Sequence, residues 1–168
     1  MFSDDTLGDY LAGKVGLVRR DIYAMPAADL LQADDIGKTM VAAHGLVTLE
    51  LVPSTQTVDL SIPRPGGMHL TVTCEFIGTP ALLTFTPRRT TARPSRFENV
   101  SGSRRLVLEA AFDHRVDAAA LASWIEQEID KLTQWFDFAN DAVAPHKARV
   151  EATAHQAIAE RVNERERP

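Results

Sequence analysis

The chain of 168 residues is 45% hydrophobic and 24% charged, the composition of one soluble globular domain large enough to bury a hydrophobic core. Its net charge of −5 argues against general nucleic-acid binding, which needs a broad basic face, and its single cysteine, Cys74, excludes an intramolecular disulfide and a cysteine-rich zinc site. No stretch approaches the roughly 18 consecutive apolar residues of a membrane span. The acidic N-terminus also lacks the apolar run of a secretory signal, so we expect a cytoplasmic protein that contacts no membrane.

The N-terminal quarter of the chain changes pattern near Pro26. Residues 1–14 carry little periodicity, and the segment VGLVRRDIYA at residues 15–24 could form a strand. Pro26 suits the first turn of a helix, and apolar residues then recur at helical spacing until Gly45. We therefore predict a helical region of one or two helices over residues 26–44.

From residue 46 the apolar period changes to two, which is typical of strands with one buried face. The alternating segments are LVTLELV (46–52), TVDLSI (57–62), MHLTVTCEF (68–76), PALLTFT (80–86) and RRLVLEAAF (104–112). With residues 15–24 they predict an antiparallel meander of about five or six strands, most of it over residues 46–112. Its apolar face needs a cover from another element.

The predicted cover is a long helix over residues 117–143. Asp117 is a candidate N-cap, and apolar residues recur behind it at helical spacing. Trp124 and Trp135 widen this stripe and are eleven residues apart, about three helical turns. They share a face of the helix, so they could also meet a second subunit.

A second helix is predicted over residues 145–168, with only a thin apolar stripe that includes Val150, Ile158 and Val162. A helix with so little apolar surface rarely folds alone, so we expect it to pair with another helix or another subunit. The predicted fold is α+β. It has one domain over residues 1–143 and a trailing charged helix that serves as a linker or an oligomerisation element.

No motif in the sequence carries catalytic chemistry. Gly37-Lys38-Thr39 lacks the first glycine of a phosphate-binding loop, because residue 32 is glutamine. The five histidines form no HExxH motif or close metal pair, so we interpret them as surface or capping residues. The serines at 101 and 103 lie in no GxSxG motif. We therefore predict neither a metal site nor a cofactor.

Positive charge is concentrated in residues 84–105. This segment holds six arginines and one acid, a net +5, which leaves −10 for the rest of a chain that totals −5. The arginines could pair with acids of the helices, bind a protein partner, or contact a phosphate or nucleic acid. The candidate contact residues are Arg88, Arg89, Arg93, Arg96 and Arg104. Phe85 and Phe97 are the only aromatic residues in this segment, so base stacking on it lacks support. A protein partner is therefore favoured over nucleic acid.

Residues 132–165 contain an aromatic and asparagine-bearing stretch followed by a helix that ends in arginines. This segment resembles the helical hairpin of uncharacterised bacterial proteins, over about a fifth of the chain. The matching positions are Trp135, Asn140, Val150, Ile158 and Arg161. His146 and Lys147 stand where that pattern has a second Phe-Asn-like pair. In those proteins the segment follows a β-rich region and leads into an effector or enzymatic domain, some of them linked to antiphage defence. The resemblance implies a modular, non-catalytic role and assigns no functional residue.

The predicted element order is also similar to that of helix-grip proteins, which bind lipids or polyketides in a cavity between the sheet and the last helix. Three functions follow as hypotheses. The first is a binding or assembly module that self-associates, or docks a partner domain, through its C-terminal helices. Its interface would include Trp124, Trp135, Val150, Ile158 and Val162. The alternatives are a helix-grip-like small-ligand protein or enzyme, and a phosphate or nucleic-acid sensor that uses the arginine-rich segment.

Overall fold

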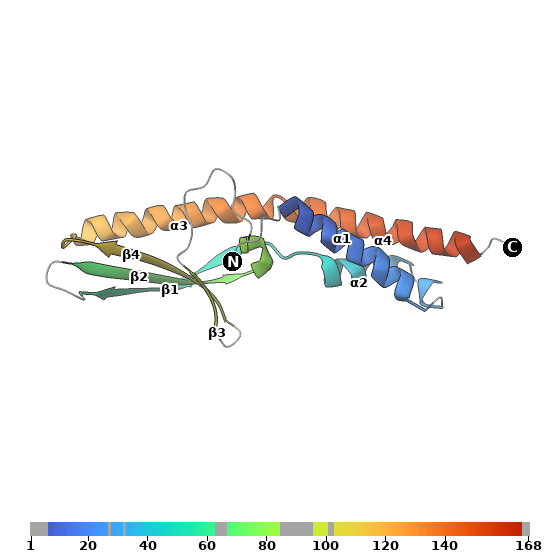
Figure 1. Ribbon diagram of the computed structural model, residues 1–168, viewed down its shortest axis with the longest axis horizontal. Helices are drawn as coiled ribbons and strands as arrows, with labels where there is room; N and C mark the ends of the chain where they lie inside the picture. Colours follow the sequence, from blue (N-terminus) through green and yellow to red (C-terminus); the bar gives the residue numbers. More distant parts are fainter. Residues whose placement is uncertain are drawn as a thin grey trace. The chain divides into compact units, whose positions relative to one another are not determined.

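A computed structural model describes residues 7–26, 28–31, 33–62, 67–84, 96–100 and 103–165 (Figure 1). The chain divides into two compact units. The helical unit comprises Met1–Val47 and Asn140–Pro168, and the sheet unit comprises Thr48–Ala139. Residues 26–44, which the sequence pattern grouped with the sheet, thus lie in the helical unit with the C-terminal helix. Among the helices that the structure describes, none combines the length and apolar character needed to cross a bilayer.

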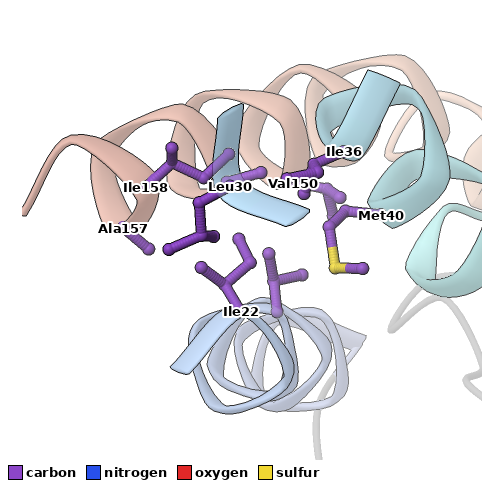
Figure 2. Packing of buried hydrophobic residues seen from close by; sticks show 9 residues of the cluster. Ile22, Leu30, Ile36, Met40, Val150, Ala157 and Ile158 are labelled. Atoms are coloured by element: carbon purple, nitrogen blue, oxygen red, sulfur yellow. The ribbon is translucent and has the colours of Figure 1, made fainter. Parts of the chain in front are cut away.

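Three helices build the helical unit: α1 (Leu7–Ala24), α2 (Ala33–His44) and α4 (Val143–Arg165). A short 3-10 turn, Asp29–Leu31, precedes α2, and α4 packs against both α1 and α2. Their side chains meet in one apolar core (Figure 2). The core residues are Val18, Ile22, Leu30, Ile36, Met40, Val150, Ala154, Ala157 and Ile158.

The strand predicted over residues 15–24 is wrong, because this segment is the second half of α1. Leu11, Val18 and Ile22 are all buried, at spacings of seven and four residues that place them on one helical face. The β-branched residues near Val15 suggested a strand, but the burial follows the helical period. Packing against α4 therefore overrides local β propensity here.

The thin stripe of α4 is covered by helices of the same chain. Val150 and Ile158 point into the core shared with α1 and α2 (Figure 2), to which Ala154 also belongs. Gly37 of α2 lies close to α4, since a Cβ there would lie 3.0 Å from Nε2 of His155. The helix thus gains its stability from tertiary packing, as expected for an element with so few apolar residues.

The sheet unit holds a sheet whose described residues form four strands: β1 (Glu50–Ser61), β2 (Met68–Ile77), β3 (Arg96–Val100) and β4 (Ser103–Phe112). All neighbours are antiparallel, in the order β1-β2-β4-β3, and α3 (Ala118–Asn140) lies along one face (Figure 1). The predicted α+β class, antiparallel sheet and long C-terminal helix are confirmed. The predicted number of strands, five or six, is wrong.

Two further strand predictions fail for separate physical reasons. The segments 46–52 and 57–62 belong largely to one strand, β1, which an irregularity between Val52 and Thr57 interrupts. The segment 80–86 begins with a 3-10 turn, Pro80–Thr84, in which the consecutive Leu82 and Leu83 are both buried. A strand would place these two leucines on opposite faces, so their burial favours the turn. The sequence patterns predicted no strand over residues 96–100, so the short β3 was missed.

The apolar face of the sheet packs on α3. Every second residue of β2 from Met68 to Phe76 is buried, and Phe76 meets Phe136 of α3 edge-on with ring centroids 6.2 Å apart. Cys74 is part of this buried row, and burial raises the pKa of its thiol, which disfavours a reactive thiolate. The predicted N-cap is confirmed, because Asp117 Oδ1 accepts a hydrogen bond of 2.8 Å from the N–H of Ala120.

Candidate interaction surface at the outer edge of the sheet

Strand β1 forms one edge of the sheet. It pairs with β2 on one side, and no described strand pairs with its other side. With twelve residues it is much longer than β3, the five-residue strand at the opposite edge. An edge strand leaves backbone N–H and C=O groups available for another strand, so long edge strands are sites of association.

A bulge divides β1 into two segments. The register with β2 shifts between Val52 and Thr57, where Pro53 supplies no N–H for pairing. The hydroxyl of Thr55 bridges the irregularity: it donates to the carbonyl of Val52 at 2.7 Å and accepts the N–H of Glu75 at 3.0 Å. The bulge therefore ends one stretch of regular pairing and begins a second at Thr57.

The second segment of β1 carries an apolar row that solvent reaches. Val58, Leu60 and Ile62 are 52%, 43% and 53% exposed, and we call these three residues the open row. Val58 lies opposite Val72, and Leu60 lies opposite Leu70, and both partners on β2 are fully buried. Residues opposite each other in a sheet share a face, so the open row continues the apolar face of the core.

Helix α3 covers the two ends of this face unequally. In its C-terminal half Leu132, Trp135 and Phe136 are buried, whereas Leu121 and Trp124 in its N-terminal half are only partly buried. Trp124 meets Phe112 edge-on, with ring centroids 6.4 Å apart.

Phe112 pairs with Met68 at the end of the sheet where the second segment of β1 pairs with β2. The incompletely buried half of α3 therefore lies over the end of the sheet that bears the open row. Two elements at the same end thus show apolar surface that the described residues leave partly uncovered.

Electrostatic protection of this edge is slight. Between Thr57 and Ile62 the only ionisable residue is Asp59, which faces the side of the sheet opposite the open row. Natural edge strands are usually protected by lysines, inward-pointing charges or prolines in the exposed stretch. The proline within β1, Pro53, lies in the bulge and outside the open row, and Pro63 follows the open row directly in the sequence.

The arginine-rich segment is described only in part. Arg88, Arg89 and Arg93 lie outside the described residues, and the described backbone of Arg96 pairs with Val107. Arg104 donates a hydrogen bond to the carbonyl of Gly78, a residue with φ of 115° where an added Cβ would collide with the Thr48 backbone. The predicted partner or anion contacts of these arginines stay predictions.

Arg105 lies with its Nε 3.3 Å from Glu75 Oε1. Both arginines of β4 thus bind groups of the same unit. Each contact therefore matches the interpretation in which the arginines of this segment pair with groups of their own chain.

The predicted helix-interface residues fall into different units. Trp124 and Trp135 belong to α3 in the sheet unit, where Trp135 is fully buried. Val150 and Ile158 belong to the core of the helical unit, and Val162 is 37% exposed outside that core. These five side chains therefore do not form one described surface.

Two of the histidines predicted to be surface or capping residues are buried. His44, at the end of α2, lies with Nε2 2.8 Å from Asp21 Oδ2, and His146 donates from Nε2 to the His44 carbonyl at 3.1 Å. His146 therefore caps one of the carbonyls that a helix C-terminus leaves without a helical partner. The hydrogen bond from Arg20 lowers the pKa of Asp21 below its usual range, and the hydrogen bond from His44 lowers it by a smaller amount.

No chemistry beyond packing is apparent in this histidine pair. Among the described residues no group of three or more His, Cys, Asp or Glu side chains could hold a metal ion. The contacts instead tie the end of α2 to α1 and α4. We interpret them as structural.

Comparison with known proteins gives no match: no family model, curated protein or solved structure is similar to the chain. The functional argument therefore depends on the open row. Sequence reasoning missed it because alternation identifies the apolar face of a strand but not its place in the sheet. The available signal was Pro53, since a proline inside an alternating run indicates an edge strand or a bulge.

Proposed function

We propose that the protein is a non-catalytic assembly module that joins a second copy of itself through the outer edge of β1. The observation that carries the proposal is the open row on β1, whose outer edge pairs with no described strand. The sequence-based hypothesis placed self-association on the C-terminal helices. The stripe of α4 is occupied within the chain, so the sheet edge offers the better surface.

A second copy suits this edge because the surface is self-complementary. Antiparallel pairing of two identical strands places an apolar row against an apolar row on one face of the joined sheet. Such an isologous contact uses the β1 edge of both copies and closes the assembly as a dimer. The remaining edges are the short β3 strands, which offer little for further growth.

The energetics favour a weak, reversible dimer. Burying a whole Val, Leu or Ile side chain contributes about 1.5–3 kcal/mol, so covering the half still exposed contributes about 1 kcal/mol each. Six side chains in two copies therefore contribute roughly 6 kcal/mol, and each backbone hydrogen bond between the strands adds about 1 kcal/mol. Association costs roughly 4–15 kcal/mol in lost freedom. With about five such hydrogen bonds the gain is roughly 11 kcal/mol, so an association cost of about 4–7 kcal/mol, the lower end of that range, corresponds to a Kd of roughly 10 µM to 1 mM.

The resemblance of residues 132–165 to bacterial modules that precede effector domains is consistent with this role. A dimerising module would bring two copies of any attached domain together. We therefore include in the proposal that the module belongs to a bacterial defence or signalling protein, where it would pair two copies of an attached domain. Phe76 of β2 and Phe136 of α3 are both buried and meet edge-on between the sheet and the helix, so the helix-grip ligand hypothesis gains no support.

Sedimentation velocity from about 10 µM to about 1 mM, a range that spans the estimated Kd, tests the proposal. We expect the wild-type mass to rise toward a dimer, and Leu60→Lys to remain monomeric because it places a charge in the open row. Thr57→Lys is the matched control, since it adds the same charge to the same strand on the opposite face.

We expect the Thr57→Lys control to dimerise like the wild type. A wild-type chain that stays monomeric throughout contradicts the proposal. Equal loss of the dimer in both lysine variants also contradicts it, because the open row would then have no special part.

A further inference from the structure

We infer that the two copies of β1 pair antiparallel about a two-fold axis at Leu60, so that each open row lies against the other along its whole length. This inference rests on the proposed self-association and specifies how the partner, a second copy of this chain, is recognised. Three observations carry it: the alternation of the open row, the position of Asp59 and the bulge.

Symmetry first limits the registers. Neighbouring antiparallel strands related by a two-fold axis have that axis perpendicular to the sheet, so both copies show the apolar face on the same side. Residues directly opposite each other share a face, so every residue of the open row must oppose a residue of the same face. The axis must therefore pass through one residue that lies opposite itself.

Only an axis at Leu60 matches the three residues of the open row completely. It opposes Val58 to the partner's Ile62 and Leu60 to the partner's Leu60. An axis at Val58 opposes Leu60 to the partner's Gln56, within the bulge, and so exchanges an apolar contact for a polar one. Apolar cross-strand pairs are the more favourable choice.

Charge removes the nearest competing register. An axis at Asp59 opposes this carboxylate to the same group in the other copy, and like charges directly opposite each other destabilise a sheet. With the axis at Leu60, Asp59 lies opposite the partner's Ser61, whose hydroxyl can donate a hydrogen bond to it. The polar face therefore agrees with the register that the apolar face selects.

The bulge sets the length of the ladder. Regular pairing of β1 with β2 resumes at Thr57, so a straight segment begins there. The open row runs from Val58 to Ile62, and its midpoint is Leu60. The joined sheet would have the order β3-β4-β2-β1 and then the same four strands of the partner in reverse, with both α3 helices on one face.

Disulfide crosslinking in a Cys74→Ala background tests the register with a mild copper oxidant. Opposed residues in antiparallel strands have Cα atoms about 4.5–5.5 Å apart, within the range that a disulfide spans. We expect Leu60→Cys to form a covalent dimer. Val58→Cys and Ile62→Cys should each stay monomeric, because each lies about four residues, roughly 13 Å, from its own copy, yet a mixture of the two should crosslink.

Ser61→Lys supplies a second measurement that needs no oxidation. It would place two lysines opposite the two Asp59 carboxylates, so we expect a several-fold lower Kd that returns to the wild-type value at high salt. A wild-type dimer that gives neither the mixed crosslink nor the Ser61→Lys effect overturns the register and leaves self-association standing. A wild-type monomer in sedimentation overturns both proposals.

Discussion

Two thin apolar surfaces of this protein differ in how far they are buried. The stripe of α4 is covered within the chain, so that Val150 and Ile158 are buried, whereas the open row of β1 is about half exposed. The helix has α1 and α2 as neighbours, and the edge strand pairs with a described strand on one side only. A thin apolar stripe thus indicates a missing partner only when the topology supplies no cover.

Removal of α4 should have the largest effect on the helical unit. A chain that ends at residue 147 loses four of the nine core residues, worth roughly 6 kcal/mol of burial, against a typical domain stability of about 5–15 kcal/mol. We expect α1 and α2 to lose most of their helical circular dichroism. A chain that ends at Arg165 is the control, and equal helicity of both truncated chains would contradict the shared core.

Single substitutions on α4 should separate its buried stripe from its exposed end. Ile158→Ala should lower the free energy of unfolding by roughly 2–4 kcal/mol, because Ile158 is 4% exposed within the core. Val162→Ala, on the same helix at 37% exposure, should cost less than about 1 kcal/mol. Denaturant titration measures both, and similar losses would indicate that the stripe is not packed as described.

Arg161 should stabilise the helical unit by capping the C-terminal end of α1. Its Nη1 donates to the carbonyls of Ile22 and Met25 at 2.6 Å and 2.8 Å, at the C-terminus of that helix. Arg161→Met should lower the free energy of unfolding by about 1–3 kcal/mol, the usual contribution of charged hydrogen bonds. Arg161→Lys keeps the charge but loses the planar guanidinium. Its stability in thermal unfolding should therefore lie between those of the wild type and Arg161→Met. Equal stability of all three proteins would remove the capping role.

Acid should weaken the contact between Asp21 and its partners. The pKa of Asp21 is lowered in the folded protein, first by the hydrogen bond from Arg20 and less by that from His44. A lowered folded pKa contributes stability above the unfolded value of about 3.9, and this stability is lost as the pH falls through the folded pKa. Asp21→Asn should therefore flatten the loss of stability below about pH 4 in denaturant titrations. An unchanged acid limb would contradict the assignment.

The sequence predicts most of what depends on local periodicity. The α3 helix, its Asp117 cap and the alternating burial of β2 all follow from patterns within one element. The failures concern what elements do together. The pattern predicts separate segments at residues 46–52 and 57–62, although β1 runs through both and Thr55 bridges the irregularity between them.

The candidate site was missed for the same reason. Alternation shows that Val58, Leu60 and Ile62 share a face, but their exposure depends on strand order and on how far α3 reaches. Likewise, the stripe of α4 is visible in the sequence, whereas its partners, α1 and α2, lie more than a hundred residues away. Long-range pairing decides both outcomes, and a single sequence does not encode it in any local pattern.

Hydrogen exchange at several protein concentrations tests the contrast between these two surfaces most directly. We expect protection of the backbone amides at residues 58–62 to rise between about 10 µM and about 1 mM, as dimers form, while protection at residues 150–158 stays constant. Concentration-dependent protection in α4 with an unchanged β1 would contradict the account, because it would place the partner on the helix and leave the sheet edge free.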